Sequence, residues 1–343
     1  METMELYAGM DLHSRNTFVG IMDKESMKRV YEKRLNNNLD VILNALEPFC
    51  NELKGIVVES TYNWYWLVDG LMDAGYNFVH LANPSAVKQY EGLKHTDDRH
   101  DAFWLAHLLS LGILPEGYIY PKEDRPIRDL LRKRSFLVRQ RTSHILSLQS
   151  MIERNLGQRI SSGEIKKLKT EDVGQIFKEE HLVLSAGVSV GNIIFLTHHI
   201  KRIEKAIKEK IKIRKSFECL LTAPGIGDIL ALTIMLEVGD ISRFRKVGNF
   251  SSYCRCVSSN RISNGKRKGK GNTKNGNKYL SWAFVEAVHH AKRCSVMIRK
   301  YYQRKAAKRN NIVAIKAVSN KLARACYYMM RDQVPFKEET FFC

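Results

Sequence analysis

The chain has 343 residues, 44% of them hydrophobic, and a formal net charge of +20. A chain of this length exceeds one small domain, so we expect two or three globular domains. So large a positive charge favours a polyanionic partner, nucleic acid first, and argues against an enzyme that serves only small acidic metabolites.

We expect a cytoplasmic protein without membrane contact, because no leader-like segment and no apolar run of roughly 20 residues is present. The seven cysteines are scattered, without a Cys-x-x-Cys pair or a matching histidine cluster. This pattern favours reduced thiols over a disulfide framework or a zinc site.

The first part of the chain alternates short apolar runs with amphipathic stretches, which predicts an α/β domain. The predicted order is strand, strand, strand, helix, strand, helix, strand, helix. The runs Leu6 to Leu12 and Gly55 to Glu59 each deliver an acid near their end, Asp11 and Glu59. The other expected strands are 17–22, 28–32 and 77–81, and the expected helices are 39–49, 65–74 and one capped by 83–85.

Two further acids, Asp98 and Asp101, stand one turn apart at the start of an apolar stretch, so the four acids are able to converge. Transfer at a phosphodiester needs its negative charge neutralised, and Mg²⁺ ions held by carboxylates do this. The structural alternative is that Asp11 and Glu59 only end strands, while Asp97 and Asp98 start a helix. That alternative is favoured for any single acid, whereas for the set the two interpretations have equal weight.

The middle of the chain is helical. From Arg125 onward apolar residues recur at spacings of three and four, and the rhythm returns in 193–207. These patterns predict two helices of coiled-coil type. The stretch between them, 157–191, is punctuated by glycines and predicts only short segments. Heptads do not reveal which chain supplies the partner, so an internal hairpin and a dimerisation element both stay open.

Near the C-terminus, the turn Ala223 to Gly227 resembles a helix-hairpin-helix, whose Gly-x-Gly turn points backbone N–H groups at a phosphate. A plain turn between helices is an equal alternative. Helices are expected at 279–291 and 312–330. From Ile241 to Val285 there is no acid, while basic residues recur. This favours nucleic acid, although solvated basic faces are common. The candidate nucleic-acid-binding residues are Gly225, Gly227, Arg261, Lys266, Arg267, Lys268, Lys270, Lys274 and Lys278.

One hydroxyl within this basic stretch, that of Ser263, directly precedes Asn264-Gly265-Lys266. Glycine and asparagine let the backbone come close to a ligand, which suits a nucleophile. The segment shows no activating partner, so these residues alone favour a solvated loop.

Taken together, the motifs resemble the DEDD transposases of the 110 family of insertion sequences, relatives of the Piv-type DNA invertases. The resemblance covers nearly the whole chain. It is carried by GMDLHS, VVES, TDDRHDA and, towards the C-terminus, APGIGDILALTIMLEVGDISRF and NRISNGKRKGKGNTKNGNKYL.

The resemblance implies three domains: a RuvC-like (RNase H-like) domain over 1–122, a helical coiled-coil oligomerisation region over 123–215, and a mostly helical transposase domain over 216–343. It implies Mg²⁺ bound by Asp11, Glu59, Asp98 and Asp101, and Ser263 as the nucleophile on DNA. The implied partners are target and donor DNA, an element-encoded non-coding (bridge) RNA, and further copies of the chain, as a dimer or tetramer.

One segment departs from the family pattern. Many relatives have Gly-Leu-x-Pro after the tyrosine that corresponds to Tyr253, where this chain has Arg-Cys-Val-Ser. Ser258 and Ser259 are therefore rivals of Ser263. A site-specific invertase of the same family, a metal-only nuclease or junction resolvase, and a non-catalytic nucleic-acid binder are the alternative functions. We further hypothesise that Asp11 and Ser263 meet between protomers, because a long helical middle would hold them apart within one chain.

Overall fold

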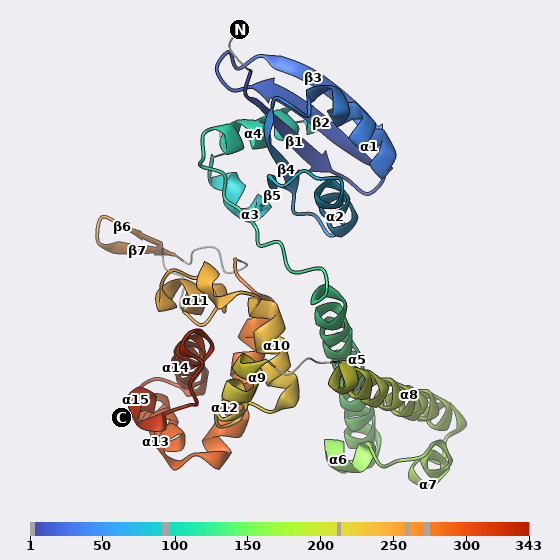
Figure 1. Cartoon of the computed structure of the whole chain (residues 1–343). Coiled ribbons are helices and arrows are strands. Elements are labelled where there is room, and N and C mark those ends of the chain that lie inside the picture. Colours follow the sequence, from blue (N-terminus) through green and yellow to red (C-terminus); the bar gives the residue numbers. More distant parts are fainter. Residues whose placement is uncertain (1–3, 91–96, 211–213, 258–260, 270–274, 343) are drawn as a thin grey trace. The chain divides into compact units, whose positions relative to one another are not determined.

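The computed structural model describes residues 4–90, 97–210, 214–257, 261–269 and 275–342 (Figure 1). It divides the chain into two compact units, 1–122 and 123–343.

A mixed five-stranded sheet forms the centre of the first unit. Its strands are β1 (Leu6–Leu12), β2 (Asn16–Asp23), β3 (Arg29–Asn36), β4 (Leu53–Glu59) and β5 (Val79–Ala82), in the spatial order β3-β2-β1-β4-β5. The pairs β3-β2 and β2-β1 are antiparallel, whereas β4 and β5 run parallel to β1. The α/β class and the element order predicted for this part are confirmed.

Helices cover the two faces of this sheet. The helices are α1 (Leu39–Leu46), α2 (Tyr65–Asp73), the short α3 (Pro84–Val87) and α4 (Asp98–Ser110), with 3-10 turns at 47–49 and 88–90. Alternate β1 residues such as Ala8 and Met10 pack in one core with α1 and α2. The opposite face of β1, which includes Gly9, meets α4.

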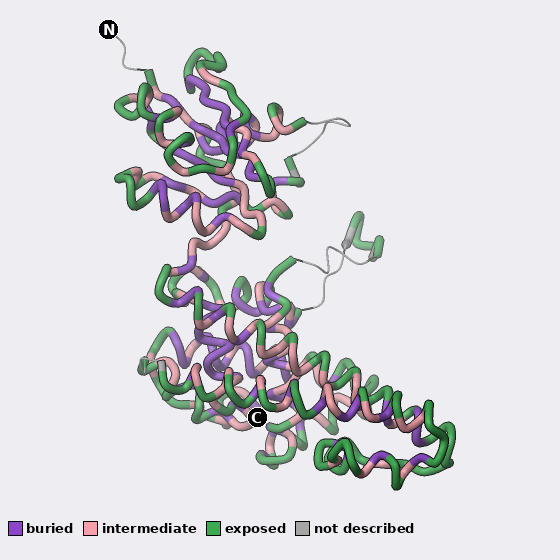
Figure 2. Tube along the Cα trace, turned by 90° about the vertical axis from the view of Figure 1, so that its right-hand side faces the viewer, coloured by how far each residue is buried: buried purple, intermediate pink, exposed green. Residues whose placement is uncertain are grey.

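The second unit begins with two long helices, α5 (Arg125–Leu156) and α8 (Glu180–Lys210), joined through α6 (Ser162–Ile165), a 3-10 turn at 170–172 and α7 (Val173–Ile176). They pair within the chain as an antiparallel hairpin: Arg134 of α5 contacts Glu204 of α8 at 2.7 Å, while Arg141, farther along α5, contacts Thr197. Figure 2 shows buried positions along the hairpin alternating with exposed ones.

The prediction of short segments as far as residue 191 is wrong, because α8 already begins at Glu180. Gly187 and Gly191 lie inside this helix. A helical glycine costs about 1 kcal/mol, and the buried neighbours Ala186 and Val190, which join the hairpin core, offset that cost. Among the described residues, α8 is also the one helix long and apolar enough by composition to cross a membrane, with a mean hydropathy of 1.4 over its most apolar window.

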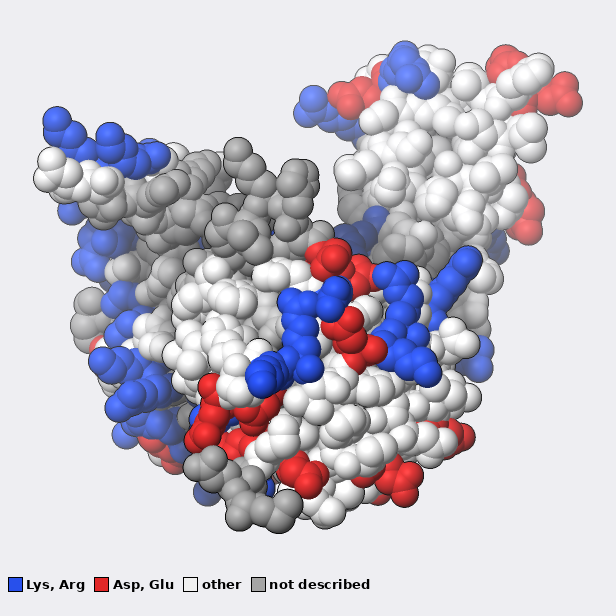
Figure 3. Space-filling view, turned by 90° about the horizontal axis from the view of Figure 1, so that it is seen from above, with Lys and Arg blue, Asp and Glu red and all other residues white. Residues whose placement is uncertain are grey.

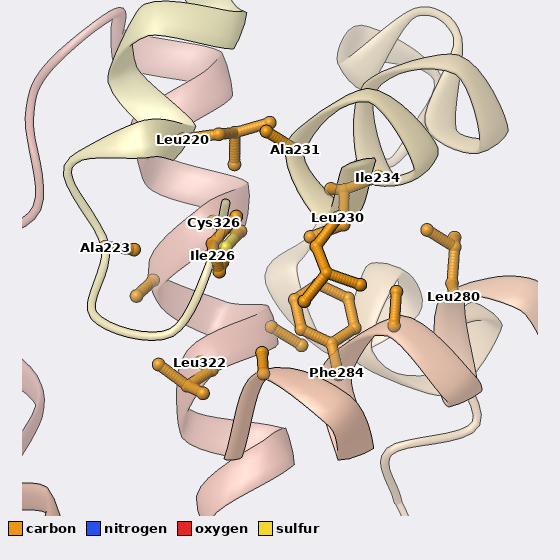
Figure 4. Packing of buried hydrophobic residues seen from close by; sticks show 14 of the residues in the cluster. Leu220, Ala223, Ile226, Leu230, Ala231, Ile234, Leu280, Phe284, Leu322 and Cys326 are labelled. Carbon is orange, nitrogen blue, oxygen red and sulfur yellow. The ribbon is translucent and has the colours of Figure 1, made fainter. Parts of the chain in front are cut away.

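The rest of the second unit is a bundle of helices around one core. Figure 4 shows Leu230 of α10 next to the ring of Phe284 of α12, and Leu322 of α14 belongs to the same cluster. Leu131 of α5 belongs to the same core, so the hairpin and the bundle are built together. The helices are α9 (Lys215–Leu221), α10 (Asp228–Val238), α11 (Val247–Tyr253), α12 (Lys278–Cys294), α13 (Val296–Lys308), α14 (Asn311–Asp332) and α15 (Glu338–Phe342), with a 3-10 turn at 241–243.

The stretch around Ser263 forms a two-stranded hairpin, β6 (Arg261–Ser263) and β7 (Lys266–Gly269), rather than the predicted loop. Asn264 and Gly265 turn it with φ angles of 51° and 70°. Positive φ at both central residues is what tight hairpin turns require, and Asn-Gly supplies it at low cost. The hairpin projects from the unit at the left of Figure 1, and Lys and Arg side chains gather at the left edge of Figure 3.

Candidate metal centre and nucleophile segment

Two of the predicted acids stand side by side at the ends of neighbouring parallel strands. The last paired residues of β1 and β4 are Met10 and Val58. Asp11 and Glu59 follow them directly, and their side chains share a hydrogen bond. Asp11 is only 3% exposed, so its carboxylate is largely removed from water.

The third element at this place is the first turn of α4, which brings Asp98 and Asp101. The helix lies so close to β1 that a Cβ on Gly9 would come within 1.8 Å of the Ala102 carbonyl oxygen. Only glycine permits this approach. Asp97 accepts a hydrogen bond from the His100 N–H at 2.7 Å, so its role as the helix cap is confirmed.

Two basic side chains, His13 and Arg34, contact the acids, and sequence reasoning missed both. His13 Nε2 lies 3.0 Å from Asp11 Oδ2 and 3.2 Å from Asp98 Oδ1. Arg34 of β3 donates to Asp98 Oδ2 at 2.7 Å. In sequence, His13 signals only a turn, and Arg34 lies 64 residues from its partner. Ligand atoms of Asp11, His13 and Asp98 all lie within 4.8 Å of one another.

The electrostatics of the cluster show like charges held together. Burial raises the pKa of Asp11, and the hydrogen bond from Glu59 and the charge of His13 offset this only in part. Burial, the hydrogen bond to Asp11 and the charges of Asp11 and Asp101 raise the pKa of Glu59 to about 7. Burial lowers the pKa of His13, but the charge of Asp11 and the contacts with Asp98 outweigh it, and the net shift is upward. Such a set favours a bound cation.

Ser263 lies in the other unit, at the end of β6, with an exposed side chain. Lys266 and Lys268 on β7 are exposed as well. In the strand register, Arg261 is paired with Gly269, and Arg267 with Ile262. The rival serines Ser258 and Ser259, like Lys270 and Lys274, lie outside the described residues.

The two ends of the segment that carries Ser263 are fastened to each other. The Asn277 N–H donates to the Tyr253 carbonyl oxygen at 2.6 Å. Arg255 Nε donates to the carbonyl oxygens of Asn275 and Gly276, both at 3.0 Å. A Cβ on Gly276 would lie 2.5 Å from the Tyr253 carbonyl oxygen, so the place where the two ends of the segment meet requires glycine.

A buried carboxylate joins the end of this segment, at Asn277, to the first turns of α5 in the helical hairpin. Glu237 of α10 is 2% exposed. It accepts from Arg128 at 3.1 Å, from Arg132 at 2.6 and 2.8 Å, and from Asn277 Nδ2 at 2.7 Å. Asn277 in turn caps α12 through Tyr279 N–H and Leu280 N–H. Sequence reasoning missed this cluster, because its members are far apart along the chain.

The Gly-x-Gly turn before α10 is packed rather than open at its first glycine. A Cβ on Gly225 would lie 2.3 Å from the Ala287 carbonyl oxygen of α12, so the fold itself requires this glycine. Gly227 precedes α10 with open space around it. Asp228, paired with Lys208 at 2.6 Å, places a negative charge in the first turn of α10. Lys278 begins α12 with its ammonium 5.2 Å from the Tyr279 ring.

Comparison with known proteins agrees with this organisation. Residues 8–155 match a family model for DEDD transposases of the IS110 type, and residues 217–303 match the Transposase IS116/IS110/IS902 family. A probable family 20 transposase of Pseudomonas aeruginosa is 24% identical over 295 residues, which cover 80% of this chain and 82% of that protein. The transposase for insertion sequence element IS1111A of Coxiella burnetii is 23% identical over 287 residues, covering 77% of this chain and 72% of that protein.

An α/β domain with clustered acids, followed by a region that matches a second model of IS110-type transposases, defines a DNA transposase, an enzyme that cuts and rejoins DNA. The chain belongs to the IS110 family of insertion-sequence transposases.

Proposed function

We propose that the protein cuts and rejoins DNA through Ser263 as nucleophile, with Mg²⁺ held by Asp11, Glu59, Asp98 and Asp101. The observation that carries the proposal is the meeting of acids from β1, β4 and α4 at one place, where burial and the neighbouring Asp11 and Asp101 raise the pKa of Glu59 to about 7. The sheet order β3-β2-β1-β4-β5, with β2 antiparallel to its neighbours, supports a RuvC-like assignment for the first unit.

The donor set fits a hard divalent cation, because it consists mainly of carboxylate oxygens on adjoining elements. A bound Mg²⁺ would supply charge neutralisation at the phosphodiester. Arg34, which contacts Asp98, places positive charge at the same edge of the sheet.

The reaction assigned to Ser263 exchanges one ester for another. Its Oγ forms a bond to the DNA phosphorus, the bond from phosphorus to a deoxyribose oxygen breaks, and the released hydroxyl takes up a proton as the serine gives one up. The DNA strand is then joined to the serine through a phosphodiester. Attack by a DNA hydroxyl reverses the step, so rejoining needs no external energy.

An element-encoded non-coding RNA is the proposed guide. This part of the proposal derives from the family, and the net charge of +20 supports only a large polyanion site. Guidance by base pairing would relieve the protein of reading DNA sequence itself. Transposition and inversion use the same chemistry, so the invertase alternative differs only in the DNA supplied.

A homo-oligomer, dimer or tetramer, is the proposed active assembly. The helical hairpin of α5 and α8 leaves apolar side chains of α8 facing solvent, with Leu184, Val188 and Phe195 at 68%, 57% and 60% exposure. Their spacing of four and seven follows a heptad, which supports a coiled-coil contact with another chain.

The decisive experiment is a search for a covalent adduct. Purified protein, RNA from its own locus, Mg²⁺ and labelled junction DNA are combined, and denaturing electrophoresis followed by peptide mass analysis locates any DNA-linked serine. We expect an adduct on the peptide that contains Ser263, lost in Ser263→Ala and kept in Ser252→Ala, which alters an exposed serine of α11. Adduct loss in Ser258→Ala or Ser259→Ala would instead move the nucleophile.

A metal-only nuclease is the second candidate, because the acids of the first unit meet without any contribution from Ser263. Cleavage without an adduct, unchanged by Ser263→Ala and abolished by Asp11→Asn, would establish that alternative. Omission of the RNA tests guidance separately: cleavage at the same sites without RNA would contradict it.

A further inference from the structure

We propose that His13 is a direct ligand, through Nε2, of the divalent cation assigned to the acid cluster. The site would then combine imidazole with carboxylates rather than carboxylates alone. The inference rests on the proposed metal centre and adds a ligand to it.

The spacing of the ligand atoms is the first argument. Neighbouring ligands of an octahedral ion with bonds near 2.1 Å lie about 3.0 Å apart. His13 Nε2 lies 3.0 Å from an oxygen of Asp11 and 3.2 Å from an oxygen of Asp98. A single Nε2–H group aligns well with only one acceptor, so an ion pair would leave the contact with one of the two carboxylate oxygens poorly aligned. A cation shared by the three atoms would satisfy all of them.

Hydrogen bonds also hold the turn that carries His13 in place. The His13 carbonyl oxygen accepts from Asn37 Nδ2 at 2.9 Å and from Asn63 Nδ2 at 3.1 Å. The His13 N–H donates to the Asn16 carbonyl oxygen at 2.9 Å. Three hydrogen bonds from three segments therefore fix the backbone from which the imidazole reaches the acids.

Threonines also fix the orientation of both asparagine amides. Thr17 Oγ1 donates to Asn37 Oδ1 at 2.7 Å, and Thr61 Oγ1 donates to Asn63 Oδ1 at 2.8 Å. Each amide oxygen is thus engaged, which leaves the NH₂ groups directed at the His13 carbonyl. Supporting hydrogen bonds of this kind are typical of metal sites, where they hold the ligand-bearing segment in place.

A ligand set with imidazole changes metal preference. Carboxylates suit Mg²⁺ and Mn²⁺ alike, whereas imidazole suits transition metals. We expect the protein to bind Mn²⁺ about tenfold or more tightly than Mg²⁺, and the His13→Gln variant to lose most of this difference.

Electron paramagnetic resonance with Mn²⁺ as the probe tests this on the full-length protein. Free Mn²⁺ gives the affinity, and echo modulation from a directly bonded nitrogen reports the imidazole. We expect nitrogen modulation in the parent, a change to the ¹⁵N pattern when only histidine is ¹⁵N-labelled, and loss of the signal in His13→Gln with about tenfold weaker binding. His80→Gln is the matched control, because His80 also contacts a carboxylate of the first unit, Glu116 at 3.1 Å.

The outcomes separate the inference from the proposal beneath it. Mn²⁺ bound in the parent and lost in Asp11→Asn, but without histidine modulation, would overturn the role of His13 and leave the metal centre standing. Modulation that persists in His13→Gln would overturn it equally. Absence of any Mn²⁺ binding that depends on Asp11 would refute the metal centre itself, and this inference with it.

Discussion

The two units each contain a buried carboxylate among other charges, and the neighbours differ. Glu237 in the second unit has two guanidinium groups and an amide donor around it. Asp11 in the first unit has Glu59 and Asp98 close by, with His13 as the compensating partner. Both carboxylates are at most 3% exposed, so burial does not distinguish them.

The pKa shifts run in opposite directions for this reason. Burial would raise the pKa of Glu237, but the hydrogen bond from Arg132 and the charges of Arg128 and Arg132 lower it. Burial raises the pKa of Asp11, and the hydrogen bond from Glu59 and the charge of His13 offset this only in part. Burial and neighbouring acids also raise the pKa of the partly buried Glu59, to about 7. The two arginines compensate the charge of Glu237, which gives this carboxylate a structural role. Clustered acids with raised pKa values are instead typical of sites that bind a ligand or do chemistry.

The largest effect on stability is expected from breaking the compensated cluster. Glu237→Ala leaves the buried guanidinium of Arg128 and that of Arg132 without their carboxylate, which should cost about 3–5 kcal/mol in the unfolding free energy of the second unit. Hydrogen exchange of α10 and α12 peptides in the full-length protein measures this locally. Exchange rates equal to those of the parent would show that the cluster does not anchor these helices.

The pH dependence of the two clusters should differ in sign. A raised pKa means that the protonated Glu59 is favoured in the fold, so its stabilising contribution is present below about 4.5 and lost as pH rises through about 7. In metal-free protein, the unfolding free energy of the first unit should fall by on the order of 2 kcal/mol between these two pH values. Glu59→Gln should abolish the loss, as hydrogen exchange of β1 and β4 peptides would report.

The second unit should not follow that curve. Because the pKa of Glu237 is lowered, its contribution to the unfolding free energy is present at any pH above the ordinary glutamate pKa. This contribution is lost only as the pH falls below that value. Protection of α10 should therefore stay constant where protection of β4 falls. A parallel decline in both units would contradict the contrast between the clusters.

The smallest effect is expected at an exposed ion pair of short distance. Lys208 Nζ lies 2.6 Å from Asp228 Oδ2, closer than Arg128 is to Glu237, but the two side chains are 58% and 46% exposed. Water and salt screen such pairs, so Lys208→Gln should leave the denaturant midpoint of the second unit unchanged. A clear destabilisation would show that distance, rather than burial, decides the contribution of these pairs.

The sequence predicted the parts of this account that depend on local patterns. Alternating apolar runs located β1 and β4, and the spacing of Asp98 and Asp101 placed them on one turn of α4. Asp97 has the pattern of a helix cap and is one. The α/β class, the family and the transposase activity followed from motifs that stand in order along the chain.

The remaining features depend on contacts between distant residues. Arg34 meets Asp98, and Arg128 meets Glu237, only because the chain folds, with separations of 64 and 109 residues. Glu237 gives no signal in sequence, because it lies next to the last residue of an apolar helix that is buried from Leu230 to Val238. The early part of α8 was missed because its glycines suggest breaks, and packing against α5 overrides that preference.

Hydrogen exchange of β1 and β4 peptides at pH 8, with and without Mg²⁺, in the parent and in Asp11→Asn, shows whether the acids of the first unit bind a cation. We predict that Mg²⁺ slows exchange in the parent and has no effect in the variant. Without metal, the variant should exchange more slowly than the parent, because the neutral amide removes a buried negative charge, and it is chiefly this burial that raises the pKa of Asp11. This prediction would be contradicted if Mg²⁺ left exchange in the parent unchanged and metal-free Asp11→Asn exchanged faster than the parent. These results would show that the acids stabilise the fold and do not bind a cation.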